Sequence, residues 1–268
     1  MQTKEKLVIG KNKNRNLEGK LAVITGAGRG LGKQMAIDLA SRGANLILTY
    51  GNSQAGAQEV VDAVEAINQK ASAIKFDVSK VENISKFRDE LKNELKIFGA
   101  EKIDILINNA GIAGAKTASD MTSEAFDELF DINLKAVFFT IRELEGLMSE
   151  NSSIINLSSS LSNHSYSFDE YMVYSSTKAA INTLTRDFAV RFGPKQIRVN
   201  AVAPGATMSD MTKDFLSDPA MAENFKQITA LNRIGYPDDI SSVVAFLASD
   251  DSRWITGEVL ETSGGAHL

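Results

Sequence analysis

Short apolar runs alternate with longer amphipathic stretches along the chain from Leu17 onward. The apolar runs are typical of buried strands, which we expect at residues 21–25, 45–50, 72–78, 103–111, 153–158, 196–205 and 258–262. The amphipathic stretches repeat apolar side chains at helical spacing, and they predict helices over residues 30–41, 54–69, 81–98, 123–149, 171–192 and 238–248. Strands that alternate with such helices form βαβ units, so the sequence predicts a parallel sheet with helices on both faces.

The domain organisation follows from the lack of any linker-like break, fixed-period repeat or low-complexity run after residue 17. We expect a single doubly wound, Rossmann-type α/β domain over residues 17–268, with about seven strands. Residues 1–16 are basic and predict a mobile tail, which either has no role or packs on a neighbouring subunit. The methionines and phenylalanines of residues 206–231 predict either a lid over an apolar substrate or contacts with the core.

Composition excludes several classes of function. The formal net charge of −5 argues against a general nucleic-acid binder, and the lack of cysteine excludes disulfides, Cys-ligated zinc and thiol catalysis. With only two histidines, we expect no metal site. No stretch approaches the roughly 18 apolar residues of a membrane span, and we expect a cytoplasmic protein with no membrane partner.

A glycine-rich loop, TGAGRGLG, follows the first expected strand and opens the first expected helix. Glycine allows a backbone to approach a pyrophosphate, and the helix start offers free N–H groups and the positive end of its dipole. This setting favours a dinucleotide site over a plain turn, with contacts from Gly26, Arg29, Gly30, Leu31 and Gly32.

The end of the second expected strand indicates which dinucleotide binds. An Asp or Glu usually stands there to hold the ribose 2′-hydroxyl of NAD, but this chain has none after Tyr50. Arg29 could pair with a 2′-phosphate, to which Asn52 and Ser53 could donate hydrogen bonds. NADP(H) is therefore favoured over NAD(H), with a solvated Arg29 as the alternative.

Tyr174 and Lys178 lie four residues apart on an expected helix, so they share a face. A free tyrosine has a pKa near 10, which is too high for efficient acid–base catalysis at neutral pH. We expect the ammonium to lower that pKa, so that the pair exchanges a proton with a carbonyl or alcohol oxygen. The same spacing also arises by accident on helix surfaces, so it needs support from other motifs.

That support is a set of motifs through which residues 17–268 resemble the short-chain dehydrogenase/reductase family, close to its 3-oxoacyl-carrier-protein reductase branch. In order they are TGAGRGLG, DVS at Asp77, NNAG at Asn108, DIN ending at Asn133, INLSS ending at Ser159, YSSTK at Tyr174, VNAVAPG ending at Gly205, and ITGEVLETSGG from Ile255.

The resemblance implies a role for each matching residue. Tyr174 would be the general acid/base, Lys178 would lower its pKa and hold the nicotinamide ribose, and Ser159 would hydrogen-bond the substrate oxygen. Asn133 would hold a water that links Lys178 to solvent, although it could simply cap backbone groups. Further cofactor contacts would come from Asp77 and Val78 at the adenine, Asn109, Ala110 and Gly111 along the cleft, and Pro204, Gly205 and Thr207 beside the nicotinamide.

One departure from the family concerns the serine, which usually precedes the tyrosine by about 13 residues. That position is Leu161 here, so Ser159 implies a two-residue insertion, with Ser160 as the alternative and an ordinary strand end as a third reading. We expect the longer loop to reshape the substrate pocket. His164 lies in this loop and is expected to be exposed or to contact substrate.

The substrate would be a small-molecule or acyl-thioester carbonyl compound. An acidic carrier protein needs a basic docking surface, but Glu143, Glu145 and Glu150 oppose the positive charges of Arg142, Lys195 and Arg198. We therefore keep 3-oxoacyl-carrier-protein reduction, a step of fatty acid biosynthesis, beside reduction of another small ketone, sugar or polyol.

The family also implies a homotetramer or homodimer, built on the helices at 123–149 and 171–192. Two other functions are weighed against a carbonyl reductase. A catalytically silent NADP-binding sensor would not need Ser159, Tyr174 and Lys178 together, and enoyl reductases typically place the lysine further from the tyrosine than YSSTK does.

Overall fold

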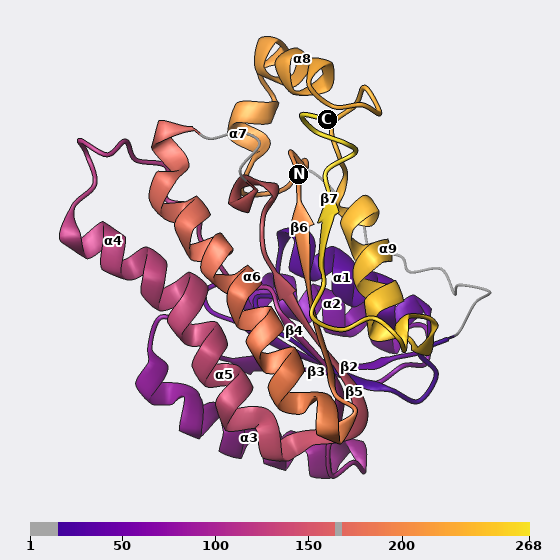
Figure 1. The fold of residues 1–268 in the computed structure, drawn as a ribbon. Helices are drawn as coiled ribbons and strands as arrows, with labels where there is room; N and C mark the ends of the chain where they lie inside the picture. The colour runs from indigo at the N-terminus through magenta and orange to yellow at the C-terminus, as the bar shows by residue number, and fades with distance from the viewer. Residues whose placement is uncertain (1–15, 164–167) are drawn as a thin grey trace.

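The computed structural model describes residues 16–163 and 168–268 (Figure 1). The expected tail, apart from Asn16, and His164 lie outside these residues. Seven strands form one parallel sheet, as the sequence predicts, and the structure places them in the order β3-β2-β1-β4-β5-β6-β7. They are β1 (Leu21–Ile24), β2 (Asn45–Tyr50), β3 (Ala71–Lys75), β4 (Ile103–Asn108), β5 (Met148–Leu157), β6 (Arg198–Pro204) and β7 (Val259–Thr262).

Helices cover both faces of this sheet and contribute to two separate apolar clusters. One cluster is completed by α1 (Gly30–Ser41), α2 (Gln54–Glu65) and α9 (Pro237–Ala248). The other is completed by α3 (Ile84–Phe98), α5 (Ala136–Leu144) and α6 (Met172–Phe192). The remaining helices are α4 (Ser123–Phe130), α7 (Lys213–Leu216) and α8 (Pro219–Gln227), and the last two lie beyond the carboxyl ends of β6 and β7 (Figure 1).

Strand β1 shows why the sequence forms this three-layer arrangement. All four of its residues are apolar and buried. Ala22 and Ile24 pack in the cluster with α1, while Leu21 and Val23 pack in the cluster with α3. A strand covered on both faces has no polar side, which explains its continuous apolar run.

The helix expected over residues 123–149 is wrong in its C-terminal part. After α4 the chain makes one π-helical segment, Asp131–Lys135, and α5 then ends at Leu144. Strand β5 already begins at Met148. Met148 is buried, but the next residues are polar and the strand is irregular there: Asn151 has a positive φ of 61°, and the pairing with β4 shifts register.

The strand order fixes where a ligand can bind. After β3 at one edge, the chain crosses back to place β4 on the other side of β1. Connections on the two sides of such a reversal run to opposite faces, which opens a crevice at the carboxyl ends of β1 and β4. The expected cofactor and catalytic residues lie at or just after the carboxyl ends of β1 to β6, at the start of α6, or, for Asn133, in the π-helical segment before α5.

Candidate active site

The glycine-rich loop approaches its neighbours too closely for side chains. Gly26 has a φ of 68°, and a Cβ atom there would lie 3.0 Å from the Cα atom of Ala110. A Cβ on Gly32 would overlap the backbone oxygen of Gly26. The loop therefore brings bare backbone to the start of α1, where Gly30 and Leu31 sit at the N-terminal end of the helix. This is the cradle that a pyrophosphate requires.

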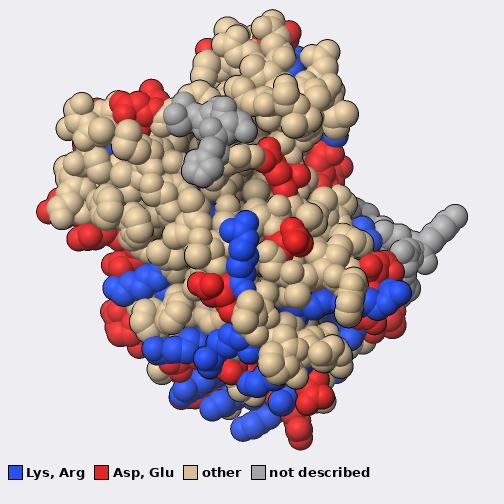
Figure 2. Space-filling model, viewed as in Figure 1, with Lys and Arg blue, Asp and Glu red and all other residues tan. Residues whose placement is uncertain are grey.

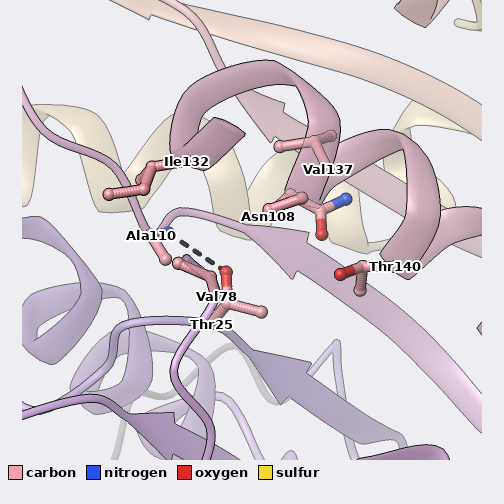
Figure 3. Close-up of a pocket in the computed structure, with 8 residues that line it drawn as sticks. Thr25, Val78, Asn108, Ala110, Ile132, Val137 and Thr140 are labelled. Atoms are coloured by element: carbon pink, nitrogen blue, oxygen red, sulfur yellow. Dashed lines mark hydrogen bonds between the residues drawn. The ribbon is translucent and has the colours of Figure 1, made fainter. Parts of the chain in front are cut away.

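Thr25 and Asn109 join this loop to the end of β4. The Thr25 hydroxyl accepts hydrogen bonds from the backbone N–H groups of Asn109 and Ala110, at 3.0 and 3.1 Å. The Asn109 amide donates to the backbone oxygens of Thr25 and Gly26, at 2.8 and 3.1 Å. Figure 3 shows the Thr25–Ala110 bond beside Val78, at a small cavity of about 10 Å³. This cavity is too small for a substrate, so it belongs to the packing behind the cleft.

The residues expected at a 2′-phosphate lie together on the surface. Arg29 precedes α1 with an exposed side chain, and Asn52 is exposed after β2. The Ser53 hydroxyl donates to the backbone oxygen of Gly28 at 3.2 Å, which ties the segment after β2 to the glycine-rich loop. The structure thus brings the cation and the polar donors of the sequence prediction to one corner of the cleft.

The other expected cofactor residues border the same edge of the sheet. The Asp77 carboxylate accepts hydrogen bonds from the backbone and hydroxyl of Ser79, at 3.1 and 2.7 Å. Beyond β6, which ends at Pro204, the Gly205 N–H donates to the Thr262 backbone oxygen at 3.1 Å. Thr207 is buried and donates to the backbone oxygen of Gly205 at 3.0 Å.

Ser159, Tyr174 and Lys178 come together at the end of β5 and the start of α6. Tyr174 is hydrogen-bonded to Ser159, the serine chosen from the sequence. Ser159 Oγ also accepts the N–H of Leu161 at 3.2 Å. Because a hydroxyl has a single proton, Ser159 is left to donate toward Tyr174 or a substrate oxygen. Lys178 is buried, and its Nζ donates to the Leu157 backbone oxygen at 2.7 Å.

The pKa of Tyr174 shifts opposite to the sequence expectation. Burial raises it to about 12, and the hydrogen bond from Ser159 only partly offsets that rise. Burial also lowers the pKa of Lys178 to about 8. The expected lowering of the Tyr174 pKa is therefore wrong for the protein alone, because burial of the phenol raises the pKa more than the Ser159 hydrogen bond lowers it.

Asn133 is buried within the π-helical segment before α5. Its side chain bonds both backbone groups of Ile112, accepting from the N–H at 3.0 Å and donating to the oxygen at 2.9 Å. Its amide also lies 3.3 Å from the Thr177 hydroxyl. A Cβ on Gly111 would lie 3.0 Å from Asn133 Oδ1 and 3.6 Å from Lys178 Nζ, so the three residues are neighbours. Such π-helical segments are frequent at functional sites.

Sequence reasoning missed two contributions to the site. Asp210, in the segment after β6, accepts a 2.9 Å hydrogen bond from the Gly30 N–H at the mouth of the glycine-rich loop. No local pattern signals a contact between residues 180 positions apart. The Asn182 side chain hydrogen-bonds Ser158 and Ser162, which flank Ser159. Because Asn182 lies four residues after Lys178, the helical spacing already places it on the same face of α6 as the catalytic pair.

Within the described residues, no group of three His, Asp or Glu side chains is arranged to hold a metal ion. In the same ranges, no helix has the length and apolar content to cross a membrane.

Comparisons with known proteins agree with this geometry. Residues 26–267 match the family described as Enoyl-(Acyl carrier protein) reductase. The chain is 40% identical to trihydroxynaphthalene reductase PfmaI of Pestalotiopsis fici, over 94% of this chain and 91% of the relative. It is 38% identical to versicolorin reductase 1 of Dothistroma septosporum, over 94% and 98%. Among solved structures, the NADP complex of angucycline C-6 ketoreductase LanV superposes with a TM-score of 0.88 at 34% identity, over 94% and 97% of the two chains.

Proposed function

The chain belongs to the short-chain dehydrogenase/reductase family, and from that premise we propose that it reduces the ketone group of a hydroxylated, fused-ring substrate with NADPH. The observation that carries the proposal is the meeting of Ser159, Tyr174 and Lys178 beside a glycine-rich cradle. Nicotinamide dinucleotide, when bound, supplies the hydride for such a reduction.

The residues of the cleft fit NADP(H). The loop from Gly26 to Gly32 would hold the pyrophosphate on backbone N–H groups, and Arg29 and Asn52 would hold the 2′-phosphate. Ser53, whose hydroxyl donates to the Gly28 backbone oxygen, would keep this segment in place beside the loop. No carboxylate follows β2 to repel that phosphate. The solved relative with bound NADP supports this choice of cofactor.

Tyr174 would act as the proton donor. With a pKa of about 12, its phenol is fully protonated at neutral pH and can give its proton to the carbonyl oxygen as negative charge develops there. Ser159 would donate a hydrogen bond to the same oxygen, which stabilises that charge. Once the proton has left, the Lys178 ammonium would stabilise the phenolate.

Aromatic and methionine side chains near Tyr174 support a flat, apolar substrate. The Tyr171 ring lies 6.2 Å from the Tyr174 ring, and Phe168 lies 6.5 Å from Tyr171, both edge to face. Met172, two residues before Tyr174, is 52% exposed. Rings and thioethers of this kind pack well against a fused aromatic system. Trihydroxynaphthalene, named for one relative, is such a compound, and phenols of this type have ketone tautomers.

A carrier-protein substrate is less well supported because Lys195 and Arg198, two of the basic residues considered for docking, offer no positive surface beside Tyr174. Lys195 follows the C-terminal end of α6, and the helix rises about 27 Å between Tyr174 and Phe192. Arg198 is buried in β6 and donates to the Leu247 backbone oxygen at 2.9 Å, so it cannot receive a partner. On the face of the molecule seen in Figures 1 and 2, the Lys and Arg side chains lie mainly in the lower half, away from α7 and α8.

We also infer that the chain self-associates through the outer surface of α4, α5 and α6. Phe126, Phe138 and Val190 are exposed there by 42%, 39% and 81%. Apolar side chains gathered on one surface typically mark an interface. Light scattering of the purified protein tests this inference, and a monomer would contradict it.

The proposed substrate is tested by following NADPH oxidation at 340 nm with a panel of carbonyl compounds. The panel contains a trihydroxynaphthalene, a quinone, acetoacetyl thioesters, simple ketones and sugars, each with NADPH and NADH. We expect the highest kcat/KM for the fused-ring phenol with NADPH. A higher kcat/KM for the acetoacetyl thioester would replace this substrate with an acyl thioester, and no turnover of any compound would contradict the reductase function.

A further inference from the structure

A tight turn follows the catalytic serine and is bonded to the side of α6. The chain forms a 3-10 turn over Ser160–Ser162. The Ser162 hydroxyl donates to the backbone oxygen of Ser159 at 2.6 Å, and the Asn182 amide donates to Ser162 Oγ at 2.8 Å. At its other end, Asn182 Oδ1 accepts the hydroxyl proton of Ser158 at 2.6 Å. Asn182 therefore holds the serines on either side of Ser159.

Each group in this series of hydrogen bonds donates to the next one, so the series has a single direction. A serine hydroxyl has one proton to donate, while a neutral amide both donates and accepts. Because Asn182 donates to Ser162, the only proton of Ser162 remains available for the Ser159 backbone oxygen. The chain of donors thus runs from Ser158 to Asn182, then to Ser162, and ends on Ser159. A side chain at position 182 that can accept a hydrogen bond but not donate one would draw the Ser162 proton toward itself and away from the Ser159 backbone oxygen.

The position of Asn182 on its helix links this chain to the reacting groups. Tyr174, Lys178 and Asn182 follow one another at intervals of four residues on α6, so they lie along one stripe of the helix. The helix that carries the proton donor and the ammonium therefore also fixes the turn after the serine. This matters for a serine that precedes the tyrosine by 15 residues, since the added length must not displace Ser159 Oγ.

We propose that Asn182 is a positioning residue that aligns Ser159 with Tyr174 through Ser162. Asn182 acts from outside the reacting groups: its side chain hydrogen-bonds Ser158 and Ser162. This inference rests on the proposed reductase function, since it assigns Asn182 a role in the same proton donation. Without Asn182, the turn loses its tie to α6, and Ser159 no longer holds the phenol and the substrate oxygen in line.

The test compares Asn182→Ala, Asn182→Asp, Ser162→Ala and the double variant Asn182→Ala/Ser162→Ala in the full chain. The substrate is the best ketone of the panel, and Thr183→Ala, an exposed neighbour on α6, is the matched control. We expect each of the three single variants to lower kcat at least tenfold, with the Kd of NADPH changed less than twofold. The double variant should be no worse than the worse single variant, because both remove one chain of bonds.

Two further readouts separate positioning from a general loss of stability. The solvent isotope effect on kcat should rise in Asn182→Ala, because proton donation becomes slower relative to the other steps. Ser162→Thr keeps the hydroxyl and should recover at least half of the wild-type kcat. If the Asn182 variants do not fold, the comparison of Ser162→Ala with Ser162→Thr decides the question alone.

The inference is overturned if Asn182→Ala keeps kcat within twofold of wild type, if the two single losses multiply in the double variant, or if Ser162→Thr is as slow as Ser162→Ala. These results differ from failure of the proposed function, which would appear as an inactive wild-type protein.

Discussion

The Nζ atom of Lys178 lies 5.7 Å from the centre of the Tyr174 ring, and it donates a 2.7 Å hydrogen bond to the backbone oxygen of Leu157. Burial lowers the pKa of Lys178 to about 8 and raises the pKa of Tyr174 to about 12. At pH 7 the phenol therefore keeps its proton and the amine is mostly charged. This is the protonation state that favours giving a proton to a ketone.

The first prediction concerns the pH dependence of ketone reduction. Tyr174 stays protonated throughout the working range, whereas Lys178 loses its charge as the pH rises through about 8. We expect kcat for reduction to be constant from about pH 6 to 7.5 and to fall above about pH 8, because a neutral amine cannot stabilise the phenolate. Stopped-flow measurement of a single turnover at saturating NADPH checks this, and a rate that stays constant to pH 10 would contradict it.

The second prediction concerns the choice of cofactor. Arg29→Ala removes the cation expected at the 2′-phosphate, and a charge-assisted hydrogen bond of about 1.5–3 kcal/mol corresponds to a roughly 10- to 100-fold weaker Kd for NADPH. Binding of NADH should change little. Fluorescence titration with both cofactors measures the effect, with Arg191→Ala at the far end of α6 as the control. An equal loss for NADPH and NADH would show that Arg29 does not recognise the phosphate.

The third prediction concerns Asp210, whose carboxylate accepts the Gly30 N–H at the mouth of the loop. A carboxylate there competes with a pyrophosphate for the N-terminal end of α1 and repels its charge. We expect Asp210→Asn to tighten NADPH binding about two- to fivefold, the equivalent of roughly 0.3–1 kcal/mol for one charge at a helix end. Weaker NADPH binding in this variant would instead mean that Asp210 supports the cofactor site.

Periodicity was sufficient to predict most of this fold. The residue ranges of α1 and β2 match the expected helix at 30–41 and strand at 45–50, because each is long and regularly patterned. The start of β5 could not be predicted, since its first residues, Met148 to Ser152, carry no strand pattern. That segment follows the sheet through irregular pairing with β4, and such pairing leaves no periodic signal in the sequence.

The candidate site was predictable as a set of motifs but not as an electrostatic environment. The YSSTK spacing places Tyr174 and Lys178 on one face of α6, and the structure agrees. The direction of the Tyr174 pKa shift depends on how much water the fold removes, and spacing along a helix carries no information about that. The contact of Asp210 with Gly30 likewise arises only when the segment after β6 folds over α1.

The central claim is that Tyr174 donates the proton in a reduction by bound NADPH. Tyr174→Phe removes only the hydroxyl, and Tyr171→Phe is the matched control on the neighbouring ring. The most direct measurement pairs the kcat of ketone reduction with the Kd of NADPH in both variants. We predict that Tyr174→Phe lowers kcat by at least about 100-fold while NADPH still binds, and that Tyr171→Phe keeps most of the turnover. Turnover by Tyr174→Phe within tenfold of wild type would contradict the account.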